Sequence, residues 1–502
     1  MTGDHSSSMK SLSAVIFSLF LFIVSAAAGE FKLPVYYSTL SNGLRIIVVP
    51  DTNVAVVSCR LYYFVGSMYE SAGFTGLSHM YEHMMFKGTK RLGTRNYARE
   101  APFIRAIDTL DLLRYNREET LGKGTADSAV QKYRKKISSF LDKQRKYIKK
   151  DEIWELYQNS GATYLNAWTA DDMTAYIVTL PKNKVELFYW IESDRMRDPV
   201  LREFTSERDV VMEERRMRYD NRPLGRYWER LNALFYIANP YRNPTIGWAS
   251  DIRAFTRQKL EHHIHRYYTP DNALVVLVGN IDSLKAKKEI ERYFGSIKRA
   301  PQQKEEVMTR EPAPIGETRF TVYDDAAPRI DMLFHTPGYP DDVLYKMDVI
   351  EGIFSGRSGR LYRRLVDKER LCTNIDASSN PRLNDSYFCI SADLKNDADP
   401  AKVERIIREE LSKAAREPPT ATEMRRITNQ IRMNFVTDLK SLEGLSDRLA
   451  WFERLGNWKD LTTYPDRIAC VKPADIPSAV QHYLDPGHMT IGILLQSPSI
   501  GK

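Results

Sequence analysis

Three residues near the start of the chain have the types and spacing of a metal-dependent hydrolytic site. His79, Glu82 and His83 form the pattern H-x-x-E-H within residues 76–89. On a helix, histidines four residues apart share one face, so both imidazoles can reach one metal ion. Glu82 then lies at the rim of that face, where a carboxylate can transfer protons. This layout is typical of zinc peptidases. The alternative is a helix that buries two histidines by chance.

The residues around this motif favour a helix. Leu77, Met80 and Met84 repeat at helical spacing, and no proline interrupts the stretch. We expect Thr75 to cap the start of the helix and Gly88 to mark its end.

A third protein ligand is needed to complete a zinc site, because two histidines leave it open. Residues 203–220 are also expected to form a helix, and Glu207, Val210, Val211 and Glu214 would share one of its faces. A carboxylate on a face with two valines points inward and needs a cation, so Glu214 is the candidate ligand. Glu213 points away and suits an ordinary surface position.

With its flanking residues, the motif resembles the pitrilysin/insulinase family of zinc endopeptidases, in the short two-domain form of the processing peptidases. The segments that carry the resemblance are Gly66-Ser67, Gly76-Leu77, Met84 and Phe86-Lys87-Gly88-Thr89. The resemblance implies Zn²⁺ as cofactor, with the third ligand at the end of an E-x-x-x-x-x-x-E pair. That pair is Glu207 and Glu214 here, and Glu207 would orient a ligand or tune the zinc-bound water.

A second segment of the sequence resembles the family's strand beside the metal. It runs Asn166-Ala167-Trp168-Thr169. The resemblance implies an exposed sheet edge that binds an extended peptide through backbone hydrogen bonds, with Asn166, Ala167 and Thr169 as substrate-binding residues. The alternative is an ordinary buried strand.

The function expected from these residues is that of a zinc-dependent endopeptidase acting on peptides or unfolded polypeptide segments. Zinc held by His79, His83 and Glu214 would activate water, and Glu82 would be the general base. The alternative is a non-catalytic peptide-binding or scaffold subunit that keeps the fold without the activity. Metal content and chelator-sensitive cleavage of an unstructured peptide separate the two.

The chain is expected to be an α/β protein of two related domains, each a mixed β-sheet packed with helices, that close as a clamshell. We predict a zinc-bearing domain over residues 29–300, a proline-containing linker over 301–318 and an inactive homologous domain over 319–502. Residues 44–49 and 54–65 are expected to form a β-hairpin before the first motif helix. A helical hairpin at about residues 101–150 accounts for the long interval between His83 and Glu214, and it suits a structural or docking arm better than a substrate-reading element.

The second copy of the domain carries no histidine pair. In single-chain relatives this copy supplies an arginine and, seven residues later, a tyrosine to the substrate carbonyl, and the matching positions here hold Val366 and Thr373. We therefore expect a homologous partner subunit in a heterodimer, or second in preference a homodimer.

The composition and the first residues of the chain indicate which partners and which cellular location to expect. The net charge of +8 comes from basic residues interspersed with acidic ones, so nucleic acid is not an expected partner. Residues 1–28 have the basic start, short apolar run and small-residue end of a cleaved signal peptide, and no later stretch suggests stable membrane insertion. We expect an exported protein, periplasmic or secreted. The four cysteines are too scattered for a disulfide framework, although one bridge stays open.

Overall fold

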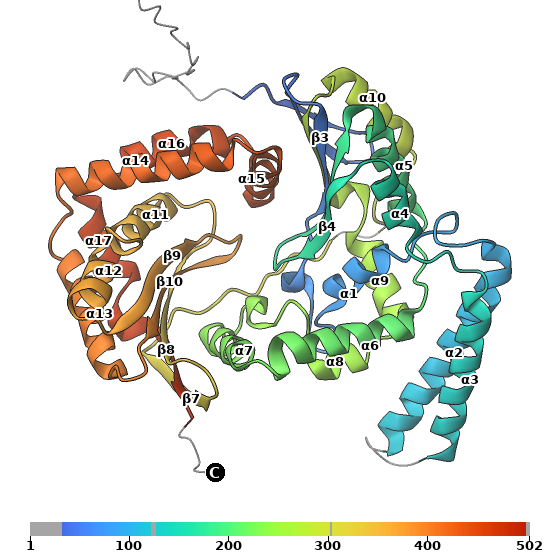
Figure 1. Cartoon of the computed structure of the whole chain (residues 1–502), viewed down its shortest axis with the longest axis horizontal. Helices are drawn as coiled ribbons and strands as arrows, with labels where there is room; N and C mark the ends of the chain where they lie inside the picture. The colour runs from blue at the N-terminus through green and yellow to red at the C-terminus, as the bar shows by residue number, and fades with distance from the viewer. Residues whose placement is uncertain (1–32, 122–126, 302–303, 498–502) are drawn as a thin grey trace, which may run out of the picture.

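The computed structural model describes residues 33–121, 127–301 and 304–497, in which two β-sheets are each packed with helices (Figure 1). This confirms the expected α/β fold class. The expected signal peptide lies outside the described residues. No helix in the described ranges is both long and apolar enough to cross a membrane. All four cysteines are free thiols, three of them buried.

The first sheet has six strands in the order β1-β2-β6-β3-β5-β4. Their bounds are β1 Tyr36–Thr39, β2 Arg45–Pro50, β3 Val56–Tyr63, β4 Thr163–Thr169, β5 Thr174–Pro181 and β6 Ala273–Gly279. The prediction that β2 and β3 form a hairpin is wrong. The strand β6 lies between them, parallel to β2 and antiparallel to β3. Every residue of β6 is buried, so this apolar strand is stable only where both of its faces are covered, at the centre of the sheet.

One face of the first sheet is covered by helices of the same half of the chain, including α1, α5, α9 and α10. The helices of this half are α1 Leu77–Met85, α2 Tyr97–Leu121, α3 Ser128–Arg145, α4 Glu152–Asn159, α5 Val185–Arg197, α6 Phe204–Arg215, α7 Pro223–Phe235, α8 Ala249–Arg253, α9 Arg257–Tyr267 and α10 Ser283–Phe294.

The second sheet repeats this topology. Its five strands have the order β7-β11-β8-β10-β9, which matches β2-β6-β3-β5-β4, and its one parallel pair, β7 with β11, corresponds to β2 with β6. The strands are β7 Thr318–Asp324, β8 Arg329–Pro337, β9 Cys372–Asn380, β10 Asp385–Leu394 and β11 Thr490–Gln496. The helices are α11 Val343–Phe354, α12 Arg360–Tyr362, α13 Pro400–Ala414, α14 Ala421–Asp438, α15 Leu442–Leu455, α16 Asp460–Cys470 and α17 Asp475–Tyr483. The domain boundaries at residues 300 and 318 stay a prediction.

Each half contributes one helix to the open sheet face of the other half. Leu449 of α15 is fully buried in a cluster with Val276 of the first sheet, and Leu231 of α7 is fully buried in a cluster with Leu494 of the second sheet. Burying such a side chain contributes about 1.5–3 kcal/mol. The two halves are therefore held together by apolar packing on both sides of the space between them.

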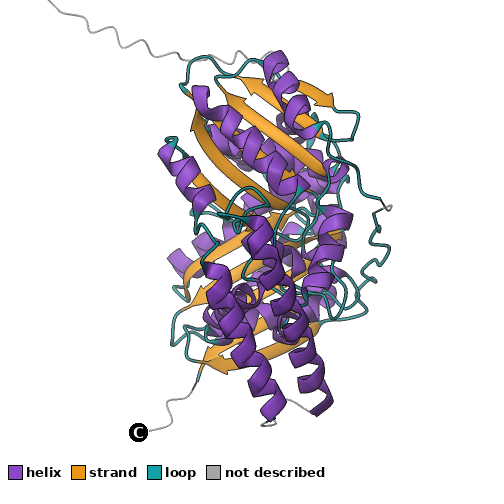
Figure 2. Ribbon diagram, turned by 90° about the vertical axis from the view of Figure 1, so that its right-hand side faces the viewer, coloured by secondary structure: helices purple, strands orange, loops and turns teal. Residues whose placement is uncertain are grey.

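The expected helical hairpin is formed by α2 and α3, and it begins at Tyr97 rather than near residue 101 (Figure 2). Its inner side is held by ring contacts of Phe103 with Phe140 and Tyr147. The middle of α2 contacts α6, because Arg208 donates hydrogen bonds to both carboxylate oxygens of Asp111, at 2.9 and 3.0 Å. The hairpin thus braces a helix that carries two of the expected site residues, which agrees with a structural role.

Candidate metal centre

The helix α1 starts from a backbone geometry that requires glycine. Gly76 has a φ of 93°, and a Cβ at this position would lie 2.4 Å from the carbonyl oxygen of Ile246. The first amides of the helix donate to one buried carboxylate, with Gly76 N 2.5 Å and Ser78 N 2.6 Å from the Glu70 oxygens. Glu70 therefore fixes where the helix begins.

The prediction that Thr75 caps the helix is wrong. The Thr75 hydroxyl donates to Asp251 at 2.7 Å, and no side chain of the helix's own N-cap residue accepts a hydrogen bond. A carboxylate from outside the helix takes the place that a local Ser or Thr cap would have. At the other end, Gly88 has a φ of 92° three residues after the helix ends at Met85, as a stop signal requires.

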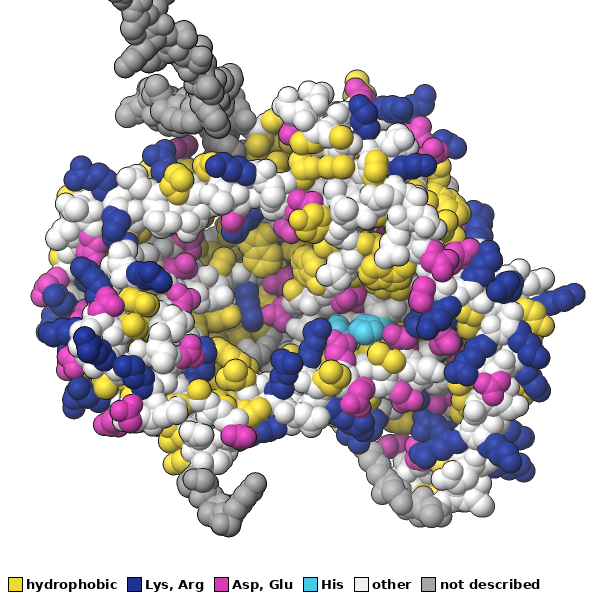
Figure 3. Space-filling model, in the orientation of Figure 1, with side chains coloured by type: hydrophobic (Ala, Val, Ile, Leu, Met, Phe, Trp, Pro, Cys, Tyr) yellow, Lys and Arg dark blue, Asp and Glu magenta, His cyan; other side chains and the backbone are white. Residues whose placement is uncertain are grey.

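Both motif histidines face the same carboxylate of α6. The Nε2 atom of His83 lies 3.2 Å from Glu214 Oε2, and that of His79 lies 3.7 Å from the same oxygen. Among the described residues, these three form the only group of His, Cys, Asp and Glu close enough to hold one metal ion, with their ligand atoms within 4.8 Å of one another. The structure thus brings together the three residues that the sequence nominated from two separate helices. In Figure 3, histidine side chains are visible at the wall of the hollow between the two halves.

The inward face of α6 differs in one residue from the expectation. Val211 is fully buried, but Val210 is 50% exposed, so only one of the two valines is turned inward. The Glu214 side chain is 19% exposed against 56% for Glu213, which pairs with Arg216 at the surface. The difference in exposure between Glu214 and Glu213 therefore agrees with the prediction from the sequence. The prediction that both valines face inward is wrong, because Val210 is exposed.

Glu207 contacts the other side of the His83 ring. Its Oε1 atom lies 3.2 Å from His83 Nδ1, and its Oε2 atom lies 2.5 Å from Lys87 Nζ. The imidazole of His83 is held between Glu207 at Nδ1 and Glu214 at Nε2, which fixes the orientation of the ring. Lys87 is the fourth group in this chain, after Glu214, His83 and Glu207, and it balances the charge of Glu207.

The donor set fits a zinc ion. Two imidazole nitrogens and one carboxylate oxygen are ligands that Zn²⁺ prefers, and three protein ligands leave a position for water. Burial and the nearby charge of His83 lower the pKa of His79 to about 4, so its ring is neutral and able to donate a lone pair. Burial disfavours the charge on His83, but the hydrogen bonds and charges of Glu207 and Glu214 outweigh it and raise the pKa of His83 to about 9. Without metal, a proton on His83 supplies the positive charge that these carboxylates require.

Glu82 lies beside the cluster and is held by the edge strand. The Thr169 hydroxyl donates to Glu82 Oε2 at 2.6 Å. Burial raises the pKa of the Glu82 carboxyl, while this hydrogen bond and the charge of His83 act in the opposite direction. A carboxyl with a raised pKa is better matched to exchanging protons near neutral pH.

The strand β4, which carries Thr169, is the edge strand of the first sheet and packs on α1. On its inner side Asn166 pairs with Ile177, and Ala167 with Tyr176, both on β5. Its outer side has no partner strand in the described part of the chain. An open edge lies next to the candidate metal ligands, as the resemblance implies, whereas the substrate-binding roles of Asn166, Ala167 and Thr169 stay predictions.

The two positions singled out in the second half lie on different elements. Val366 is half-buried in the π-helix Arg363–Lys368, and Thr373 is exposed on β9, where its hydroxyl donates to the Asp393 carbonyl. Neither offers a guanidinium or a phenol, so the groups expected to reach a substrate carbonyl are not supplied at these positions.

Sequence reasoning missed Lys87 and Glu70 as parts of the site. Lys87 follows His83 by four residues, so helical spacing could have placed it near the same carboxylates. Glu70 had no signal, because a residue seven positions before the first residue of the helix reaches it only through the fold of the intervening loop.

Comparison with known proteins finds matches to one family in two segments of the chain. Residues 45–102 match the family described as Insulinase (Peptidase family M16), and residues 254–431 match its domain described as Peptidase M16 inactive domain. A zinc protease named PqqE from Helicobacter pylori is 24% identical over 484 residues, which cover 95% of this chain and 96% of the relative. An uncharacterized zinc protease of Rickettsia felis is 24% identical, with 80% of this chain and 82% of the relative covered.

Solved structures share the fold. The crystal structure of a protease from Helicobacter pylori matches with a TM-score of 0.77 and 23% identity, covering 92% of this chain and 100% of that one. The periplasmic protease PqqL from Escherichia coli matches with a TM-score of 0.69 and 17% identity, covering 94% of this chain and 48% of that one. Together with the solved structures, the matches over residues 45–102 and 254–431 confirm the resemblance seen in the sequence: the chain contains domains of the insulinase family of peptidases, M16.

Proposed function

We propose that this chain is a zinc-dependent endopeptidase that hydrolyses peptides or unfolded polypeptide segments. The observation that carries the proposal is the convergence of His79, His83 and Glu214 beside the free carboxylate of Glu82. The relatives' names support the peptidase class and zinc as the metal. The assignment of Glu82 as general base rests on its position and on the raised pKa of its carboxyl.

The residues have distinct tasks in this proposal. A bound zinc ion would supply Lewis-acid polarisation of the scissile carbonyl and a lowered pKa for the attacking water. Glu82 would accept the proton of that water and deliver it to the leaving nitrogen. Thr169 would hold the Glu82 carboxylate in place through its hydrogen bond. The open edge of β4 would bind an extended substrate through its backbone, which leaves side-chain specificity loose.

A test of this proposal uses the purified chain and an unstructured peptide. We expect cleavage that a chelator abolishes and added zinc restores. The variant Glu82→Gln should keep its zinc and lose at least 99% of turnover, on the order of the 10²–10⁴-fold contribution of a positioned general base. Full turnover in Glu82→Gln would remove Glu82 from the mechanism.

A second candidate function is that of a zinc-bearing subunit that cleaves peptides only together with a homologous partner. The observation that favours it is the presence of Val366 and Thr373 where single-chain relatives carry an arginine and a tyrosine. If the chain holds zinc but cleaves nothing alone, a homologous partner subunit, in a heterodimer or second in preference a homodimer, would supply the missing groups. Size measurement and mass spectrometry of proteins that co-purify with the tagged chain test this.

We further propose that the protein acts after export, in a periplasm or outside the cell. The composition of residues 1–28 supports this, as does the periplasmic description of the structurally similar PqqL. The amino-terminal sequence of the mature protein, isolated from its source, tests it.

A further inference from the structure

The second half contains a cavity at the place that corresponds to the metal centre. In the first half, α1 follows β3 and packs on the edge strand β4 and on α6. In the second half, α11 follows β8 and packs on the edge strand β9 and on α14. Because the two sheets have the same strand order, the space between α11, α14 and β9 is the counterpart of the space that holds the metal ligands.

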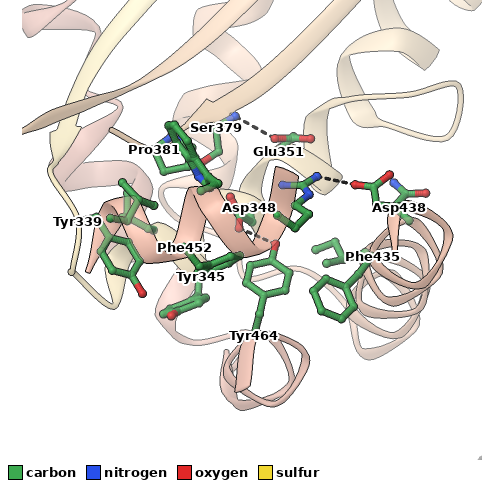
Figure 4. A pocket seen from close by; sticks show the side chains of 16 residues that line it. Tyr339, Tyr345, Asp348, Glu351, Ser379, Pro381, Phe435, Asp438, Phe452 and Tyr464 are labelled. Carbon is green, nitrogen blue, oxygen red and sulfur yellow. Dashed lines mark hydrogen bonds and ion pairs between the residues drawn. The ribbon is translucent and has the colours of Figure 1, made fainter. Parts of the chain in front are cut away.

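This space is a cavity of about 330 Å³ (Figure 4). Its walls come from α11, β9, α14, α15 and α16, and its volume is large enough for the end of one long side chain. None of its described lining residues is a histidine. The chemistry of the first half's site has therefore been replaced, while the hollow between the same elements has been kept.

The charged groups of the lining are mostly acidic. Asp348, Glu351 and Asp438 contribute three carboxylates, and the one cation among the described lining residues is Arg448, which already pairs with Asp438. The Asp348 carboxylate accepts a hydrogen bond from Tyr464 at 2.7 Å. The lining therefore holds two carboxyl groups, those of Asp348 and Glu351, that form no ion pair with its described cation.

Glu351 is the residue whose charge is least compensated. Its Oε2 atom accepts one hydrogen bond, from the backbone amide of Ser379 at 2.8 Å, in the way that Glu82 is held by Thr169 in the first half. Burial raises the pKa of the Glu351 carboxyl to about 7, against the opposing effect of this hydrogen bond. No described cation pairs with it, so a carboxylate oxygen is left to interact with whatever enters the cavity.

The remaining walls are aromatic. Tyr464 lies at the centre of a group of rings, 5.5 Å from Phe435, 5.9 Å from Tyr345 and 6.2 Å from Phe452 between ring centroids. Aromatic faces beside carboxylates favour an organic cation with an apolar stem. A metal ion fits less well, because these carboxylates do not converge on one point as the cluster in the first half does.

The cavity adjoins the end of the strand proposed to bind substrate. A second hollow, of about 330 Å³, lies between the two halves and is lined by Ala170 and Asp171, directly after β4. It shares with the first cavity the lining residues Ser379, Pro381, Arg448 and Trp451. A polypeptide that leaves the edge of β4 in this direction would pass the mouth of the acidic, aromatic cavity.

We propose that this cavity binds a cationic side chain, lysine or arginine, of the polypeptide held by the first half. The inference rests on the proposed function, because it deepens the substrate class of that peptidase. The two halves then have complementary tasks, since the first holds the scissile bond and the second selects a basic residue at a distance from it.

The test compares two fluorescent 20-residue unstructured peptides that differ only in charge. One carries three lysines and the other carries Nε-acetyl-lysine at the same positions. Binding is measured by anisotropy with the Glu82→Gln protein, which prevents turnover, at about 0.15 M ionic strength to screen surface attraction. We expect the lysine peptide to bind about tenfold more tightly, the range of a partly desolvated cation beside aromatic rings.

Three variants in the same background make the test specific. Glu351→Gln keeps an acceptor for Ser379 N and should remove the preference, and so should Asn434→Arg, which places a guanidinium in the lining. Asp397→Asn removes one exposed carboxylate elsewhere and should leave the preference unchanged. Equal binding of the two peptides, binding of neither, or a preference that survives Glu351→Gln would overturn the inference. A wild-type protein without zinc-dependent cleavage would instead refute the proposed function, whether or not the lysine preference is present.

Discussion

The contact between Glu207 and His83 yields a prediction whose size follows from the geometry. When His83 binds a metal through Nε2, its Nδ1 carries the proton and donates it to Glu207 Oε1, at 3.2 Å. The other oxygen of Glu207 accepts from Lys87 at 2.5 Å. A glutamine at position 207 has only one acceptor oxygen for these two donors, so one of them loses its partner in a mostly buried position.

We therefore expect Glu207→Gln to weaken zinc binding by about 10–100-fold, or about 1.4–2.7 kcal/mol, the range found when a partner of a metal-bound histidine is removed. Competition with a chromogenic chelator at pH 7.5 measures the change. Lys87→Met is the matched control, because it keeps the bond to His83 and removes only the balancing cation, so its loss should be smaller. Zinc affinity within twofold of the wild type in a folded Glu207→Gln protein would refute the proposed role of Glu207.

Two further predictions concern residues that stabilise the fold around the site. Arg382 is half-buried against three tyrosine rings and pairs across the two halves with Asp171 at 2.9 Å. Arg382→Met should lower the free energy of unfolding by about 3 kcal/mol, since a partly buried charge loses its partner. A urea midpoint equal to that of the wild type would contradict this. Burial raises the pKa of Glu70 from 4.5 to about 7. The folded state then holds the proton more tightly than the unfolded state, so this group's contribution to stability should fall as the pH rises from 4.5 to 7, by on the order of 3 kcal/mol. The difference in urea midpoint between wild type and Glu70→Gln, followed across this window, isolates the effect, and a difference independent of pH would show that Glu70 does not titrate there.

Local patterns in the sequence were enough to nominate the residues of the candidate site. The four-residue spacing of His79 and His83 and the seven-residue spacing of Glu207 and Glu214 each describe one helical face, and a face is a property of the helix alone. The structure places these four side chains in contact, while their roles in metal binding and catalysis stay predictions.

Features that depend on distant parts of the chain were not accessible in the same way. The insertion of β6 between β2 and β3 joins residues more than 200 positions apart, and a short turn between two apolar strands predicts a hairpin instead. The cap supplied by Glu70 and the exposure of Val210 have the same origin, because both follow from how the surrounding elements pack. The repeat of the domain could be recognised, but the exchange of α7 and α15 between the two sheets could not, since an amphipathic helix does not specify which sheet it covers.

The metal content of two neighbouring variants tests the central claim most directly. Glu214 and Glu213 are adjacent on α6, but only Glu214 faces the imidazoles of His79 and His83. After loading with zinc and removal of the excess, mass spectrometry should find about one zinc ion per chain in the wild type and in Glu213→Gln, as expected for a single site with three protein ligands. Glu214→Gln should retain far less. A Glu214→Gln protein with the full zinc content of the wild type would contradict the proposed site.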